Sequence, residues 1–129
     1  MPFKEPYHTR ITTIHEIEPG IVRVEIKGDI EVELEDLMEH WKVMKEHYNE
    51  KNKACFLSVF NPYTTISTEA REKFGDPDEN LHKKAEAIVV KSLPHLMLAK
   101  FHTTFYKHNY PNKVFKDEES ALEWLRQYR

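Results

Sequence analysis

The stretch Ala-Cys-Phe-Leu-Ser-Val-Phe, residues 54–60, decides the fold class of this 129-residue chain. All of its side chains except Ser58 are apolar, and runs of this kind form strands that are covered on both faces, as in parallel sheets. Glu-Ala-Ile-Val-Val, residues 86–90, has a similar pattern. We therefore predict two buried strands within one sheet, the first of them central.

Helices are predicted between and beyond these strands. Residues 34–48 place apolar side chains three or four positions apart, with charged residues on the other face, which is typical of an amphipathic helix. A second, short helix is expected to begin near Ser67, because hydroxyl residues cap helix starts. Pro94 suits the first turn of a third helix that reaches Tyr106. Residues 117–120, which are acidic and end in serine, are expected to cap a last helix.

Further strands are predicted near the start of the chain and before the last helix. Residues 11–17 alternate partly and residues 22–26 cleanly between apolar and polar side chains, and the Pro-Gly pair between them is typical of a tight turn. A brief strand is expected at residues 113–115. Strands separated by helices pair in parallel through right-handed crossovers. The order ββαβαβαβα therefore predicts an α/β fold with one mixed sheet, mostly parallel with an antiparallel edge strand, and flanked by helices. No linker or repeat interrupts it, so we expect a single domain over residues 1–129.

Composition restricts the partners and the compartment. The chain has 22 acidic and 19 basic residues and a net charge of -3, so it has no overall positive field to attract nucleic acid. The only cysteine, Cys55, cannot form an internal disulfide and fits a reducing compartment. Residues 1–10 lack the apolar core of a signal peptide, and no apolar stretch is long enough to span a membrane. We predict a cytoplasmic protein without a membrane span.

The end of the chain carries a resemblance to a known family. Ala-Ile-Val-Val at residues 87–90 is followed, at residues 111–125, by Pro-Asn-Lys-Val-Phe-Lys-Asp-Glu-Glu-Ser-Ala-Leu-Glu-Trp-Leu. Together with the order of elements and the chain length, this sequence resembles the SpoIIAA-like (STAS) domains, especially uncharacterised bacterial members. The resemblance spans nearly the whole chain and implies a SpoIIAA-like fold.

That resemblance also implies a regulatory site. In the anti-sigma-factor antagonists of the family, a partner kinase phosphorylates a serine at the start of the helix after the central strand, and this controls partner binding. The matching residues here are Thr64, Thr65, Ser67 and Thr68. The Asp-Ser-Ser-Gly signature of those proteins is absent, since residues 61–68 read Asn-Pro-Tyr-Thr-Thr-Ile-Ser-Thr. The alternative role of Ser67 or Thr68 is that of a helix cap.

Motifs of catalysis and of metal binding are missing. His40 and His47 lie seven residues apart, as do His95 and His102, without the closer spacing or the cysteines of common zinc motifs. Cys55 lies in a predicted buried strand, where a thiol is usually a small core residue. The chain has 3 glycines, too few for a glycine-rich phosphate loop. We predict no metal ligand, no cofactor and no catalytic residue.

Aromatic side chains allow a different function. Trp41, Tyr48, Phe101 and Phe105 belong to the first and third predicted helices and could line an apolar pocket, although core packing is the commoner use of such residues. A pocket would suit a small-molecule or lipid carrier, as in the Sec14-like relatives sometimes grouped with this fold. Exposed Tyr106 or Tyr110 could instead mark a homodimer surface.

The leading hypothesis is a non-enzymatic regulatory or protein-binding module. Its surface around residues 64–68 and the following helix is expected to meet another, unidentified protein. A small-molecule or lipid-binding carrier is the first alternative, and an enzyme is the least favoured.

Overall fold

A computed structural model describes residues 2–74, 76–105 and 110–129, without the side chains of Pro77 and of residues 101–105. Within these residues the chain forms a six-stranded sheet. The strands, in spatial order, are β1 (Tyr7–His8), β2 (Thr12–Glu18), β3 (Ile21–Ile26), β5 (Ala54–Phe60), β7 (Lys83–Val90) and β8 (Asn112–Phe115).

The pairing of the strands follows the predicted pattern. The first three strands pair antiparallel, and β3, β5, β7 and β8 pair in parallel. The turn between β2 and β3 contains Gly20 at a φ of +81°, a left-handed conformation that glycine adopts without steric cost. The predicted mixed sheet, mostly parallel with an antiparallel edge, is therefore confirmed.

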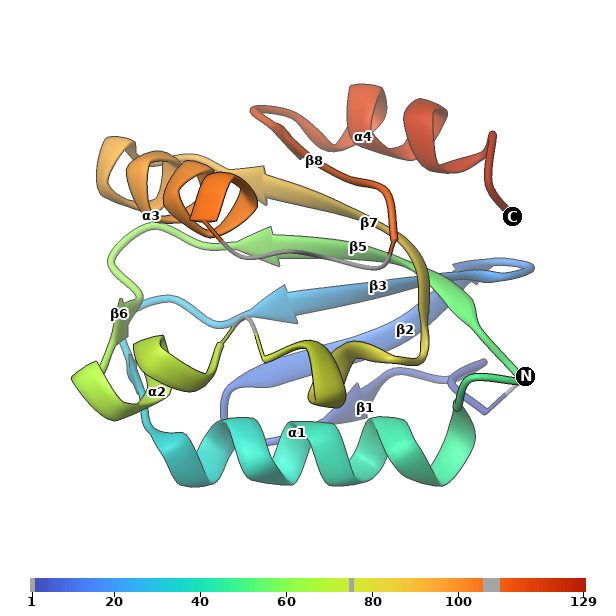
Figure 1. The fold of residues 1–129 in the computed structure, drawn as a ribbon, viewed down its shortest axis with the longest axis horizontal. Helices are drawn as coiled ribbons and strands as arrows, with labels where there is room; N and C mark the ends of the chain where they lie inside the picture. The colour runs from blue at the N-terminus through green and yellow to red at the C-terminus, as the bar shows by residue number, and fades with distance from the viewer. Residues whose placement is uncertain (1, 75, 106–109) are drawn as a thin grey trace.

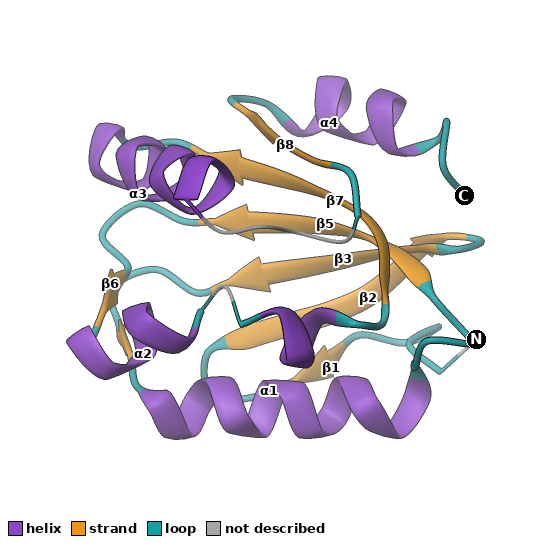
Figure 2. Ribbon diagram, viewed as in Figure 1, coloured by secondary structure: helices purple, strands orange, loops and turns teal. Residues whose placement is uncertain are grey.

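Helices lie on both sides of this sheet (Figures 1 and 2). They are α1 (Leu34–His47), α2 (Thr68–Lys73), α3 (Leu93–Phe105), α4 (Glu118–Leu125) and the 3-10 turn η1 (Pro77–Asn80). Two short segments, β4 (Glu31–Val32) and β6 (Thr65–Ile66), pair in parallel outside the main sheet. The predicted helices are all present, whereas β1, β4, β6 and η1 are additional.

The two faces of the sheet have separate cores. Along β5, Phe56 and Phe60 join a core with residues of α1, α2 and α3. The residues between them, Leu57 and Val59, join a second core with Ala121 and Leu125 of α4, where Cys55 is also buried. Since successive strand residues point to opposite faces, the apolar run of β5 serves both cores. In Figure 1, α1 and α4 accordingly lie on opposite sides of the central strands.

The first turn of α1 is held in place by an ion pair. Arg10, between β1 and β2, donates from Nε to Oδ1 of Asp36 over 2.7 Å. The same carboxylate accepts the backbone N–H of Glu33 over 2.8 Å. This contact ties the start of α1 to the edge of the sheet. The helix then passes over the sheet with Leu37, His40 and Trp41 toward it.

Candidate functional site

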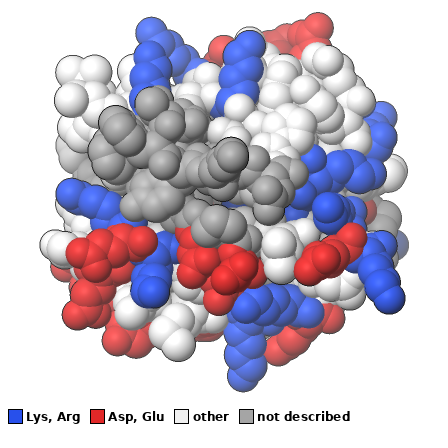
Figure 3. All heavy atoms as spheres, in the orientation of Figure 1, with Lys and Arg blue, Asp and Glu red and all other residues white. Residues whose placement is uncertain are grey.

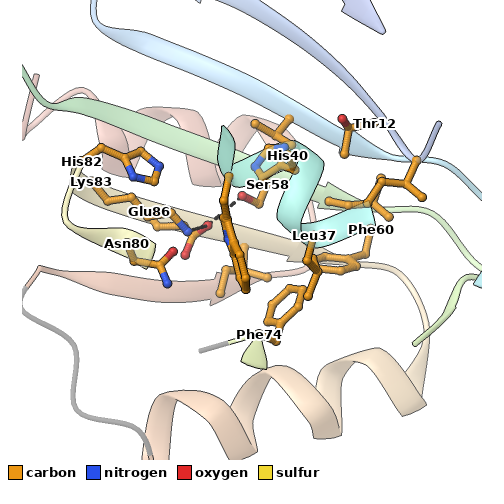
Figure 4. A pocket seen from close by; sticks show the side chains of 15 residues that line it. Thr12, Leu37, His40, Ser58, Phe60, Phe74, Asn80, His82, Lys83 and Glu86 are labelled. Carbon is orange, nitrogen blue, oxygen red and sulfur yellow. Dashed lines mark hydrogen bonds and ion pairs between the residues drawn. The ribbon is translucent and has the colours of Figure 1, made fainter. Parts of the chain in front are cut away.

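A cavity of about 70 Å³ lies between α1 and the sheet. Figure 4 shows that most of its polar side chains lie toward one end. Leu37, Phe60 and Phe74 gather at one end, and His82, Lys83, Glu86 and Asn80 at the other. The complete set of polar lining residues is Thr12, His40, Ser58, Asn80, His82, Lys83 and Glu86.

The polar end is built on the two central strands. Ser58 of β5 donates from Oγ to Oε2 of Glu86 on β7 over 2.8 Å, and Lys83 donates from Nζ to the same oxygen over 2.8 Å. In a regular strand, residues three apart point to opposite faces. Here Ala54 pairs with Lys83 but the next residue, Cys55, pairs with Ala85, so the strand carries one extra residue. This irregularity turns Lys83 to the same face as Glu86.

A tyrosine closes the polar cluster from the segment before β8. The side chain of Tyr110 hydrogen-bonds to Glu86, and Lys83 Nζ lies 5.8 Å from the centre of the Tyr110 ring. Burial, reinforced by the charge and the hydrogen bond of Glu86, raises the pKa of the Tyr110 hydroxyl. Tyr110 is half-buried and belongs to this cluster, and its role at a homodimer surface stays a prediction.

Two histidines beside the cluster are held neutral. Burial, together with the nearby charge of Lys83, lowers the pKa of His40 to about 4 and that of His82 to about 3. The His82 ring packs at right angles on Phe56, with the centres 5.1 Å apart. Nδ1 of His40 is buried and finds no hydrogen-bond partner in the described part of the chain. This nitrogen, on a ring that lines the cavity, therefore has unused hydrogen-bonding capacity among the described residues.

The described residues contain no group of three or more His, Cys, Asp or Glu side chains arranged to hold a metal ion.

A second hollow, an open groove of about 400 Å³, separates β6 from α3. Thr64 and Thr65 form one side, Pro94, Met97 and Leu98 the other. Ile66, Arg71 and His95 also line it. Met97 is 65% exposed and the neighbouring Leu93 is 68% exposed, which is unusual for large apolar side chains.

The predicted hydroxyl residues have four different environments. Thr64 is buried, and its Oγ1 donates to the carbonyl of Lys27 over 2.6 Å. Thr65 is exposed at the edge of the groove. Ser67 is the N-cap of α2, where its Oγ accepts the backbone N–H of Ala70 over 3.2 Å. Thr68 is exposed in the first turn of α2 and does not line the groove.

The structure describes the side chains of only two of the four residues predicted to line an aromatic pocket. Trp41 lines the cavity. Tyr48 is buried, packs on Phe56 with ring centres 5.7 Å apart, and is not part of the cavity wall. Phe101 and Phe105 belong to α3, but their side chains lie outside the described residues, as does the whole of Tyr106.

Sequence reasoning missed the polar end of the cavity. The one available signal was Ser58, the single polar residue within an otherwise apolar strand, together with Glu86 at the start of another. A buried polar side chain requires a hydrogen-bond partner. That requirement applies to both residues, but it does not by itself identify their partners.

The charged residues on one face of the molecule do not form a field of one sign. Figure 3 shows lysines and arginines interspersed with acidic residues on the face that it presents. No helix in the described part of the chain combines the length and apolar character needed to cross a bilayer.

Comparisons with known proteins identify the fold. A family model described as "Domain of unknown function (DUF7793)" matches residues 15–129. The structure is similar to the crystal structure of an uncharacterised protein of the DUF3478 family with a SpoIIAA-like fold, from Shewanella loihica PV-4. The TM-score is 0.62 at 16% identity, over 88% of this chain and 91% of the other. No curated protein matches the sequence. The predicted SpoIIAA-like fold is therefore confirmed.

Proposed function

We propose that this chain, which belongs to the DUF7793 family of domains of unknown function, is a non-enzymatic regulatory module that binds another protein through the groove between β6 and α3. The observation that carries the proposal is the exposure of Met97 on the wall of that groove, next to exposed Leu93. Contiguous exposed apolar side chains with a polar border are typical of protein interaction sites.

The lining of the groove suggests the chemistry of the partner. Pro94, Met97 and Leu98 offer an apolar wall, and Arg71 is the charged residue of the lining. A partner segment with an apolar side chain followed by a carboxylate would satisfy both features, since arginine forms bidentate hydrogen bonds with carboxylates. We therefore expect an acidic, apolar peptide segment of another protein as the occupant.

Thr65 is the residue at which a negative charge would control this binding. It is exposed and lies on the same groove as Arg71. A phosphate there would add negative charge and repel an acidic partner. Thr64 is unsuited to this role because its hydroxyl is buried and hydrogen-bonded, and Ser67 is engaged as a helix cap.

Site-specific photo-cross-linking in the native cells tests the proposal. A benzoylphenylalanine at position 97 is compared with one at Glu123, which is exposed on α4 across the sheet. We expect a discrete protein adduct from position 97 only. Thr65→Glu should lower its yield at least fivefold, whereas Ser120→Glu, a control at an exposed position of α4 outside the groove, should leave it unchanged.

Three results would contradict the proposal. One is the absence of an adduct from position 97, and another is the same set of adducts from both positions. The third is an adduct of two copies of this chain, because it would show that the groove joins identical subunits.

A further inference from the structure

We propose that the cavity between α1 and the sheet is a binding site for a small uncharged alcohol, with its hydroxyl at the polar end and its hydrocarbon part at the apolar end. This site is separate from the groove, and the proposal does not depend on the protein-binding function. Its basis is the division of the wall that Figure 4 shows, together with the charge balance of the polar end.

Among the residues that the structure describes, the polar end carries no net charge. Lys83 and Glu86 neutralise each other through a contact of 2.8 Å. Burial, with the charge of Lys83, keeps the pKa values of His40 and His82 low enough that both rings are neutral at pH 7. An ionic head group would bring an unpaired charge into this wall, which is strongly unfavourable away from water. A neutral head group avoids that cost.

The same end has hydrogen-bonding capacity for a hydroxyl group. Nδ1 of His40 is buried and has no partner within the described residues. A neutral imidazole offers either a donor or an acceptor at this atom, and a hydroxyl group can complement both. A group that can only accept, or only donate, would match just one tautomer. An alcohol is therefore the simplest ligand that satisfies this atom.

Size and apolar lining determine the rest of the ligand. Leu37, Phe60 and Phe74 lie at the end away from Glu86. The volume is about 70 Å³, whereas an apolar cavity of about 150 Å³ accommodates benzene and water takes about 30 Å³ per molecule. Scaled from benzene, about three non-hydrogen atoms therefore fit, so the ligand is a short alcohol with two or three carbon atoms.

Nuclear magnetic resonance titration of the full chain at pH 7 tests this assignment. The probes are 1-propanol, propionate and propylammonium, which share a hydrocarbon part and differ in the charge of the head group. We expect saturable shifts with 1-propanol at the amides of Leu37, Ser58 and Ile88, which all line the cavity. Propionate and propylammonium should bind at least tenfold more weakly.

Two variants of α1 test the role of the unpaired nitrogen. His40→Phe keeps an aromatic ring at the wall but removes Nδ1, and should weaken 1-propanol binding at least fivefold. His47→Phe is the matched control, because His47 is exposed on the same helix and packs on Phe3 outside the cavity. Circular dichroism establishes that both variants are folded.

The proposal would be overturned by several results. Shifts that do not saturate with 1-propanol would mean that the cavity holds water only. Equal affinity for the three probes would contradict the argument from charge. Unchanged affinity in a folded His40→Phe variant would contradict the proposed hydrogen bond to Nδ1. If that variant does not fold, the comparison of the three probes on the unmodified chain still decides the proposal.

Discussion

Replacing Lys83 with methionine removes the positive charge that lies 2.8 Å from the Glu86 carboxylate. The two side chains are 14% and 11% exposed, so the pair is largely buried. Breaking a buried pair by removing one partner costs about 3–5 kcal/mol in proteins. Ser58 and Tyr110 still donate to Glu86 in the variant. We therefore expect the lower end of that range, a loss of about 3 kcal/mol in the free energy of unfolding at pH 7.

The loss should depend on pH in a defined direction. Without Lys83, the ionised form of Glu86 loses its counter-ion, so the folded variant binds a proton at Glu86 more tightly than the folded wild type does. The difference in stability is complete where Glu86 is ionised in both proteins, and it narrows as the pH falls and the variant takes up the proton first. In that range, the gap between variant and wild type should narrow by up to about 1.4 kcal/mol per pH unit.

Urea unfolding followed by tryptophan fluorescence measures these differences at pH 7 and pH 5, always against wild type at the same pH. Lys84→Met is the matched control, because Lys84 is the exposed neighbour, and its effect should stay within about 0.5 kcal/mol. The double variant Lys83→Met/Glu86→Gln should regain at least half of the loss. A loss below about 1 kcal/mol, or a double variant as unstable as the single one, would refute the account of the buried pair.

Three further outcomes follow from the fold. Leu125→Ala removes a fully buried side chain of α4 and should lower the free energy of unfolding by about 3 kcal/mol in urea, whereas exposed Gln127→Ala should not. Gly20→Ala should lower the free energy of unfolding, measured by thermal unfolding, by about 1 kcal/mol. The nearest atom to an added Cβ is 3.6 Å away, so the cost comes from the backbone φ of +81° and not from a steric clash. Cys55, whose thiol pKa is raised by burial, should react with a disulfide reagent at least about 100-fold more slowly in the native protein than in urea; comparable rates would contradict its burial.

Much of the fold was predictable because its elements have local signals. The alternation of residues 22–26 and the helical spacing of residues 34–48 predict β3 and α1 directly. The cap at Asp117, which accepts the N–H of Ser120 over 2.7 Å, also follows from residue type. By contrast, β6 has two residues and depends on distant backbone groups, such as the carbonyl of Ile30 that accepts the N–H of Thr65. Nothing local marks such a segment as a strand.

The sites were less predictable than the fold. Ser67 was expected as a cap or as a modified residue, and its capping bond is present. Thr64 was placed on the surface, but its hydroxyl bonds to the carbonyl of Lys27 and is buried, because a contact between distant segments decides its exposure. The polar end of the cavity depends on the alignment of β5 with β7 and on the extra residue after Lys83. Periodicity within one strand contains no information about either.

The hydrogen bond between Ser58 and Glu86 also has a consequence for how the chain assembles. Both strands are apolar on each face, so hydrophobicity alone would tolerate several alignments of one against the other. Sliding β7 by one residue would turn Glu86 toward Ala121 and Leu125, where a carboxylate would be buried among side chains that cannot bond to it. The pair thus penalises a one-residue shift of β7 against β5 and favours the observed alignment.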